Sequence, residues 1–284
     1  MKRQFKVHRK DQGSSLLHFL RKYCCEAPSI RALKRSIEKK RCTVNDRVET
    51  FSTHPLREGD KVQIDWEEKK YAPQVPILLW EDEYLAAYDK SSGTLSCSQN
   101  FFCDALLHRL DRETSGVLIT AKKREIFQEM LLLFKQRRVH KEYLALVDGV
   151  VKEGEKRIVS QLAPRHRWQG QTVYGSSSLG KEAITEWRLL QRSSTASLLL
   201  CWPITGRTHQ LRVHLKEAGH PVLGDYQYAP CFPFSLRATR HLLHSHKIHF
   251  IHPRTGRPVK IIAPLPLDFL EALKYLKLDG KSYF

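Results

Sequence analysis

Two short segments near the start of the chain place their hydrophobic residues at the three- and four-residue spacing of a helix. Residues 14–24, SSLLHFLRKYC, begin with serines that can serve as an N-cap, and a second segment begins at another cap, Ser29. In the second segment the apolar residues form one stripe and the basic residues lie away from it. These basic residues are Arg31, Lys34 and Arg35. The pattern predicts two amphipathic helices, the second with one packed face and one positive face.

Between residues 41 and 64 the pattern changes to short strand-like runs separated by turns. RCTVNDRVE predicts a strand and a turn, and LREGDKVQI predicts a tight turn at 58–60 that leads into another strand. The polar, proline-containing stretch WEEKKYAPQVP follows and is typical of a linker. We therefore expect a small domain at residues 1–70 and a larger one at residues 71–284.

From about residue 77 the chain alternates strand-like runs with helical segments. ILLWEDEYLAAYDK predicts two strands around an acidic turn, GVLITAK and EYLALVDG predict strands, and EIFQEMLLLFKQRR predicts an amphipathic helix. TEWRLLQR, ASLLLCWPI and HKIHFIHP predict further strands, and THQLRVHLKEAG predicts a helix that ends at Gly219. The expected fold class is mixed α/β (α+β), with a small α/β domain followed by a largely antiparallel central sheet.

The net charge indicates a polyanionic partner. The 284 residues include 48 Lys and Arg against 30 Asp and Glu, a formal charge of +18 that is spread along the chain. A folded basic domain attracts phosphates over long range, so nucleic acid is the leading class of partner. The alternative is a basic protein whose charge serves only its solubility.

Composition also limits the compartment. The seven cysteines include no C-x-x-C pair, which argues against a disulfide framework and against a cysteine-rich zinc site. The N-terminal segment is too polar for a signal peptide, and apolar runs such as residues 130–134 are far too short to span a membrane. We expect a cytoplasmic protein with no membrane association.

The most informative segment is HRLDRETSG at residues 108–116, which leads directly into the predicted strand VLITAK. By themselves, an aspartate between two arginines and a Thr-Ser-Gly turn could form a surface ion-pair cluster. The segment resembles, however, the signature loop of the RluA-type RNA pseudouridine synthases. That resemblance implies that Asp111 is the catalytic aspartate.

The resemblance covers nearly the whole chain. WEDEYLAAYDKSSGTLS is similar to the family's first segment, with Asp89-Lys90-Ser91 in place of the usual Asn-Lys-Pro, and HKEYLALVDG places Tyr143 at the position of the active-site tyrosine. ITGRTHQLRVHLKEAGHPVLGDYQY and HFIHPRTGRPVKIIAPLPLDF are similar to later segments. Residues 1–70 resemble an S4-type RNA-binding domain, except that Lys40 and Asp46 stand where that family commonly has glycine.

The family's arginine in the H-Q-L-R position implies an ion pair between Arg212 and Asp111. The predicted helix would place His209 and Arg212 on one face at i,i+3 spacing. Burial against a base can raise the pKa of a carboxyl by about 3–5, whereas a close arginine lowers it by about 1–3. The arginine would therefore keep a buried nucleophile charged and aimed.

The other site residues divide between chemistry and RNA binding. Tyr143 could stack on the target base, and its phenol could serve a proton transfer at C5. Arg109 corresponds to an arginine that occupies the space vacated by the flipped uridine in relatives. Arg207 is expected to contact a phosphate or brace its loop, His209 to contact RNA, and the basic residues of the second helix to bind RNA as in S4 domains.

No cofactor is expected, because breaking the N1–C1′ bond and joining C5 to C1′ involves no redox change. The clustered histidines suggest a metal site, but acidic or cysteine ligands at suitable spacing are missing, so we expect no metal. The histidines concerned are His241, His244, His246, His249 and His252.

The resemblance implies an enzyme that isomerises specific uridines in structured RNA, with ribosomal RNA favoured over tRNA. We expect a monomer, although the sequence does not fix the oligomeric state. The nucleophile could add to C6, attack C1′ or act through a glycal, and the sequence does not choose among these routes. Two alternatives remain open. One is a non-catalytic RNA-binding or ribosome-assembly factor that retains the fold, and the other is a glycosidase that uses Asp111 and Glu113.

Overall fold

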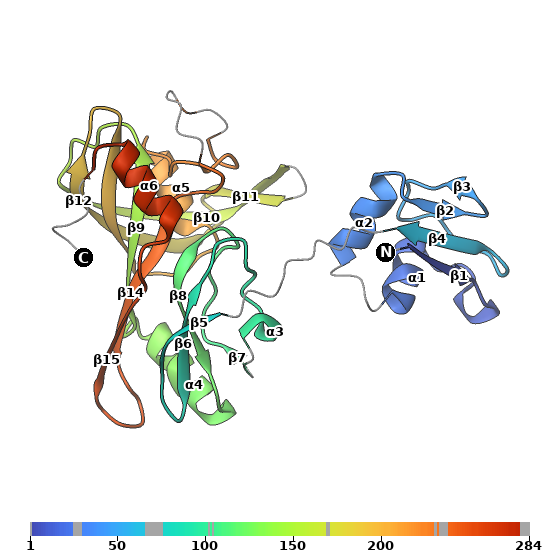
Figure 1. Ribbon diagram of the computed structural model, residues 1–284, viewed down its shortest axis with the longest axis horizontal. Helices are drawn as coiled ribbons and strands as arrows, with labels where there is room; N and C mark the ends of the chain where they lie inside the picture. Colours follow the sequence, from blue (N-terminus) through green and yellow to red (C-terminus); the bar gives the residue numbers. More distant parts are fainter. Residues whose placement is uncertain are drawn as a thin grey trace. The chain divides into compact units, whose positions relative to one another are not determined.

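The chain folds into two compact units, Met1–Ala72 and Pro73–Phe284, in a computed structural model (Figure 1). The structure describes residues 2–24, 30–65, 76–101, 103, 105–168, 171–229, 232 and 238–278. Within these ranges no helix is both long enough and apolar enough to cross a membrane. Each unit has its own hydrophobic core, so the two units are described separately.

The first unit is a four-stranded antiparallel sheet, in the order β1-β4-β2-β3, with two helices. Its elements are β1 (Lys2–Lys6), the 3-10 helix η1 (Arg9–Asp11), α1 (Leu16–Tyr23), α2 (Ile30–Glu38), β2 (Cys42–Val44), β3 (Arg47–Val48) and β4 (Lys61–Asp65). The Ser15 side chain caps α1 by accepting a hydrogen bond from the His18 N–H. The predicted cap Ser29 lies outside the described residues. Leu33 and Ile37 of α2 are buried, as the stripe predicts.

Two turns of this unit use left-handed backbone at non-glycine residues. Lys40 has φ of 60° and Asp46 has φ of 62°, a conformation that favours glycine. Both turns are therefore formed here without glycine at these positions.

The second unit is built on an 11-stranded sheet in the order β11-β10-β12-β13-β9-β14-β8-β6-β5, with β15 paired to β14 and β7 to β8. The strands are β5 (Ile77–Glu81), β6 (Leu85–Lys90), β7 (Ala105–Leu106), β8 (Ser115–Ala121), β9 (His140–Asp148), β10 (Glu155–Trp168), β11 (Gln171–Ser176), β12 (Lys181–Arg192), β13 (Ala196–Pro203), β14 (Leu243–Ile251) and β15 (Pro258–Ile262). The helices are α3 (Ser98–Phe101), α4 (Arg124–Lys135), α5 (Gln210–Glu217) and α6 (Leu267–Tyr275). This arrangement confirms the predicted fold class.

Helices cover both faces of the sheet. On β9, Tyr143 and Ala145 share a hydrophobic cluster with α5, whereas Leu144 and Leu146 share one with α6 on the opposite face. The helix α4 covers the β5–β8 part of the sheet through Ile126, Met130 and Leu133, which recur at helical spacing (Figure 1). The continuous apolar run of β8 follows from burial on both faces.

The two parts of the sheet join where β8 pairs in parallel with β14, whereas the other described pairings are antiparallel. Gly116 of β8 lies opposite Ser245 of β14 and has φ of +108°. A Cβ atom at position 116 would lie 2.2 Å from the Ser245 carbonyl oxygen, so a side chain there would force the strands apart. Glycine at this position therefore allows the loop before β8 to sit against β14.

Candidate active site

Asp111 lies in the loop that connects β7 to β8, four residues before the buried strand begins. The Thr114 N–H donates to the Asp111 carbonyl at 3.1 Å and closes a tight turn around the aspartate. The Ser96 hydroxyl contacts the neighbouring backbone, at 3.0 Å from the Leu110 carbonyl oxygen. A turn that enters a fully buried strand holds its side chains in fixed positions, so the aspartate is placed by rigid structure.

Lys90, at the end of β6, holds the same loop through hydrogen bonds to backbone carbonyls. It is fully buried, and its ammonium donates to the carbonyls of Arg112 at 2.9 Å, Thr94 at 2.9 Å and Ser91 at 3.1 Å. Burial lowers the pKa of Lys90 to about 7. The three carbonyls supply the hydrogen bonds that a buried ammonium requires.

Arg240 connects the loop to α6. Its guanidinium donates to the Glu113 carbonyl at 3.1 Å and forms a bidentate pair with Asp268, with nitrogen–oxygen distances of 2.6 and 2.8 Å. The Arg240 side chain is buried, which makes this paired geometry strong and directional. The backbone on both sides of Asp111 is thus held by side chains from separate elements.

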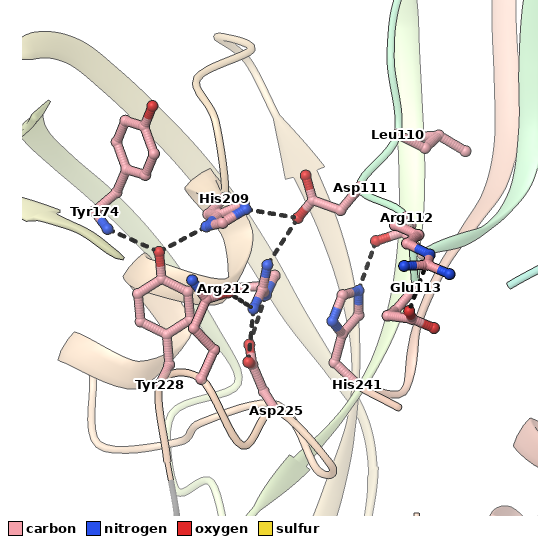
Figure 2. A network of polar contacts seen from close by, with 12 residues as sticks. Leu110, Asp111, Arg112, Glu113, Tyr174, His209, Arg212, Asp225, Tyr228 and His241 are labelled. Carbon is pink, nitrogen blue, oxygen red and sulfur yellow. Dashed lines mark hydrogen bonds and ion pairs between the residues drawn. The ribbon is translucent and has the colours of Figure 1, made fainter. Parts of the chain in front are cut away.

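The Asp111 carboxylate points toward the start of α5 (Figure 2). Its Oδ2 lies 3.1 Å from Arg212 Nη1 and 3.9 Å from His209 Nε2. The Asp111 side chain is 26% exposed, whereas Arg212 is 5% exposed. A buried cation therefore faces an anion that solvent or a substrate can still reach.

Arg212 has a second and more buried partner, Asp225. Arg212 Nε and Nη2 each lie 2.7 Å from an Asp225 carboxylate oxygen, and Nη2 also donates to the Gln227 Oε1 at 2.8 Å. The guanidinium carbon lies 4.9 Å from the centre of the Tyr228 ring, over its face. Burial alone would lower the pKa of Arg212, but the Asp225 hydrogen bonds and the charges of Asp225 and Asp111 raise it. Arg212 is therefore a fixed cation.

Asp225 is not predicted from the sequence, although it lies in the family-like segment ITGRTHQLRVHLKEAGHPVLGDYQY. The signal that could have indicated Asp225 is the presence of an acidic residue in the same segment as Arg212.

His209 comes immediately before α5 rather than within it. Its φ is 57°, in the left-handed region, and the helix begins at Gln210, so the predicted placement of His209 on the helix face is wrong. The left-handed residue turns the imidazole toward the site. His209 Nδ1 lies 2.8 Å from the Tyr228 hydroxyl, which accepts a hydrogen bond from the Tyr174 N–H at 3.0 Å. Burial lowers the pKa of His209.

Tyr143 is buried on β9, where it pairs in register with Ser245 of β14 and Cys201 of β13. It shares a hydrophobic cluster with Leu110, the residue before the aspartate. Burial raises the pKa of Tyr143 to about 12, with Ser245 acting in the opposite direction and the Asp111 charge adding to the rise. At neutral pH the side chain is therefore a phenol that can donate a proton.

Among the described residues, neither Arg207 nor Arg109 forms a hydrogen bond or ion pair with Asp111, His209 or Arg212. Arg207 is exposed and its Nε donates to the Glu182 carbonyl at 2.8 Å, which makes it a loop brace in this structure. Arg109 is exposed on the Asp111 loop. In the first unit, Lys34 and Arg35 are exposed on α2, and the Arg31 side chain lies outside the described residues.

Glu113 does not face Asp111. Its carboxylate accepts from the Ser92 hydroxyl at 3.2 Å and lies 3.7 Å from Arg112 Nε, and the two acidic side chains point in different directions (Figure 2). A two-carboxylate glycosidase needs both groups at one substrate bond. The geometry therefore gives that alternative no support.

Two of the clustered histidines join β14 to the Asp111 loop and β8. His241 Nε2 lies 2.8 Å from the Thr114 hydroxyl, and His244 Nδ1 lies 2.9 Å from the Ser115 hydroxyl. Burial lowers the pKa of His241 well below its usual range and that of His244 to about 3. Both are neutral hydrogen-bonding groups. Among the described residues, no group of three or more His, Cys, Asp or Glu side chains could hold a metal ion.

Comparison with known proteins identifies the same region. Residues 104–217 match the family model described as RNA pseudouridylate synthase. The chain is 36% identical over 250 residues to ribosomal large subunit pseudouridine synthase C of Yersinia pestis, covering 80% of this chain and 78% of that protein. It is 31% identical over 262 residues to the protein of the same name from Escherichia coli strain K12, covering 79% and 81%.

Solved structures show the same fold. Human RNA pseudouridylate synthase domain containing 4 superposes with a TM-score of 0.59 at 23% identity, covering 72% of this chain and 94% of that one. Human RNA pseudouridylate synthase domain containing 1 gives a TM-score of 0.57 at 27% identity, covering 68% and 85%.

Proposed function

The chain belongs to the RluA-type RNA pseudouridine synthases, and from this premise we propose that it isomerises specific uridines of ribosomal RNA, with Asp111 as the nucleophile. The observation that carries the proposal is the contact between a partly exposed Asp111 and a buried Arg212. A buried guanidinium stabilises the charge of the carboxylate, while the exposed side leaves room for a flipped nucleotide.

The two carboxylate oxygens of Asp111 have different surroundings. Arg212 and His209 both face Oδ2, and no hydrogen bond to Oδ1 comes from the part of the chain that the structure describes. Oδ1 is therefore the oxygen that would attack C1′ or add to C6 of the base. The net reaction breaks the N1–C1′ bond, forms a C5–C1′ bond and moves the C5 proton to N1, so atoms and electrons balance without a further reactant.

Tyr143 is proposed to contact the flipped base. Its position on β9 beside Leu110 supports a packing role, and its raised pKa keeps the phenol protonated at neutral pH, which argues against a role as a base. The proton that leaves C5 then requires another acceptor, such as the carboxylate or water.

Ribosomal RNA is proposed as the substrate because the curated relatives carry that substrate in their names, and the charge of +18 supports a polyanion. The alternative of a non-catalytic RNA-binding factor predicts binding without modification.

The test compares Asp111→Asn with Glu113→Gln on large-subunit ribosomal RNA and on tRNA. Both changes replace an acid by its isosteric amide, two residues apart, but Glu113 points away from the site. We expect wild type and Glu113→Gln to form pseudouridine in ribosomal RNA, and Asp111→Asn to bind RNA without forming product. Modification of tRNA alone would overturn the substrate, full activity of Asp111→Asn would overturn the nucleophile, and binding without product by wild type would favour the non-catalytic factor.

We further propose that the first unit is an S4-like RNA-binding domain. The support is the exposure of Lys34 and Arg35 on α2, opposite the buried stripe of Leu33 and Ile37. Replacing both cations by glutamine in the full chain should weaken RNA binding and leave kcat at saturating RNA unchanged. Arg57→Gln, an exposed change in a turn of the same unit, serves as the control. Unchanged affinity of the double variant would contradict this assignment.

A further inference from the structure

A groove of about 450 Å³ lies beside the Asp111 site, between the β10–β11 hairpin, α5 and residues 227–228. Its volume is within the range of about 300–1,000 Å³ that is usual for sites of single small ligands. A groove of this size suits one nucleotide rather than a duplex.

The groove shares a wall with the Arg212 network. Tyr228 lines the groove, and its hydroxyl pairs with His209 while its ring lies against the Arg212 guanidinium. Gln227 lines the groove and accepts from Arg212. Tyr174 and Tyr228 both lie on the side of His209 that is away from Asp111 (Figure 2). A ligand in the groove would therefore be separated from His209 and Arg212 only by the side chains of Gln227 and Tyr228.

The floor and walls suit a base. Val173 of β11 and Val213 of α5 are buried and form apolar surface, and Tyr174 and Tyr228 add aromatic rings. Flipping a uridine removes a stacking partner from the nucleotide next to it. Aromatic side chains replace such stacking in single-stranded RNA recognition, whatever the identity of the base.

Two cations on the rim of the groove have no acidic partner among the described residues. Arg165 and Lys216 are exposed, and neither forms an ion pair with any residue that the structure describes. The nearby acid, Glu217, is held against β11 by the Ser176 N–H at 2.9 Å and the Ser176 hydroxyl at 2.6 Å and keeps its charge, so these three charged residues leave the rim with a net charge of +1. The rim is therefore suited to a phosphate.

The strand pairing directs Arg165 over the groove. The register between β10 and β11 shifts between Pro164 and His166, which leaves Arg165 outside the regular ladder. A Cβ atom at Gly175 would lie 3.1 Å from the Arg165 Cγ, so the absence of a side chain at 175 lets the arginine stem lie across β11. The position of Arg165 is thus built into the hairpin.

We propose that this groove binds the nucleotide adjacent to the target uridine, with its base against Tyr174 and Tyr228 and its phosphate between Arg165 and Lys216. This inference rests on the proposed function, because it assumes that an RNA strand enters the site. It assigns RNA selection near the target to the β10–β11 hairpin and α5, whose groove residues touch neither Asp111 nor the reacting atoms.

The first test removes the rim charges. Arg165→Ala combined with Lys216→Ala should raise the KM for RNA about tenfold with kcat unchanged, and should reduce the slope of log affinity against log salt by roughly 0.7 for each phosphate that the protein no longer neutralises. Arg257→Ala combined with Lys152→Ala is the matched control, since it removes one exposed arginine and one exposed lysine outside the groove. Equal effects of the two double variants, or no effect of the first, would overturn the proposal.

The second test removes the ring without changing charge. Tyr174→Leu should raise the KM for normal RNA severalfold relative to wild type. On RNA with an abasic site directly on one side of the target uridine, the KM of the variant should equal that of wild type, because the base that would contact Tyr174 is missing. If an abasic site on either side of the uridine weakens RNA binding equally for wild type and Tyr174→Leu, the neighbouring base does not occupy the groove. RNA binding is measured alongside turnover, so an inactive wild type would overturn the proposed function while the binding data still decide the groove.

Discussion

Arg212 is held by Asp225 more closely than by Asp111. Two nitrogens of the guanidinium lie 2.7 Å from the Asp225 oxygens, whereas a single nitrogen lies 3.1 Å from Asp111. Asp225 is 2% exposed and Asp111 is 26% exposed. Arg212 is therefore oriented by Asp225 whether or not Asp111 is engaged by substrate, so that the arginine is preorganised for the carboxylate that we propose as the nucleophile.

Removing Asp225 should destabilise the fold as well as the site. Asp225→Ala leaves the buried Arg212 cation without its main partner, which costs about 3–5 kcal/mol in comparable buried pairs. Asp225→Asn retains hydrogen-bonding atoms but not the charge, so we expect a smaller loss of stability and a lower kcat. Urea denaturation and single-turnover rates measure the two effects. Glu153→Ala, which breaks an exposed pair with Lys156, should leave stability close to that of wild type, and an equally small effect of Asp225→Ala would show that Asp225 is dispensable.

Tyr143→Phe separates packing from proton transfer. The change keeps the buried ring and removes the hydroxyl, so stability and RNA affinity should stay close to wild type. If the phenol donates a proton in the reaction, kcat should fall by about 10²–10⁴. Because the pKa of Tyr143 is raised to about 12, the wild-type rate should show no tyrosine ionisation between pH 6 and 10. A wild-type kcat in Tyr143→Phe would limit this residue to packing.

Each site residue that the sequence predicts is recognised from the short segment around it. The features that the sequence does not predict depend on contacts between distant segments. Asp111 and Arg212 stand in recognisable segments, and the structure brings them within 3.1 Å. The ion pair between Asp225 and Arg212 depends on where the turn that contains Asp225 lies in the folded chain, and the local sequence does not predict that position. His209 is predicted to lie on the helix as part of the stretch THQLRVHLKEAG, but the helix begins at Gln210, and the left-handed His209 places its ring between Asp111 and Tyr228.

In the sheet, too, local patterns are predicted from the sequence and long-range pairings are not. Strands with clear alternation or a continuous apolar run, such as β8 and β9, are predicted from the sequence, because their patterns follow directly from burial. The β10–β11 hairpin is not predicted, since its charged residues and shifted register hide the alternation. The parallel pairing of β8 with β14 joins residues 129 positions apart, as between Ser115 and His244, and has no local pattern.

Gly116→Ala should disrupt the junction of β8 with β14. The added methyl group would lie 2.2 Å from the Ser245 carbonyl oxygen, and the φ of +108° is unfavourable for alanine, so the strands must separate. Both activity and thermal stability should fall, because the Asp111 loop leads into Gly116. Gly154→Ala is the control, since its added methyl group would meet no described atom within 4 Å and its φ is not left-handed. Equal melting temperatures for the two variants would contradict the close approach of β8 and β14.

Lys141 supplies a pH-dependent prediction. It lies at the start of β9, two residues before Tyr143 and therefore on the same strand face, and a Cβ atom at Gly206 would lie 3.9 Å from its ammonium. It has no hydrogen bond or ion pair with the residues that the structure describes. Burial lowers the pKa of Lys141 from 10.5 to about 8. The charged form is therefore less stable in the folded protein than in the unfolded chain.

The sign of the effect follows from proton binding. Between pH 8 and 10.5 the folded protein releases the Lys141 proton while the unfolded chain retains it, so the contribution of this residue to stability rises with pH. Lys141→Met removes this partly buried charge and should melt a few degrees above wild type at pH 7, at about 2–4 °C per kcal/mol for a domain of this size. The difference should shrink as the pH is raised to 10. Lys152→Met, an exposed change beyond the other end of β9, should show no such trend, and a Lys141→Met difference that is absent or constant from pH 7 to 10 would show that the ammonium is fully hydrated.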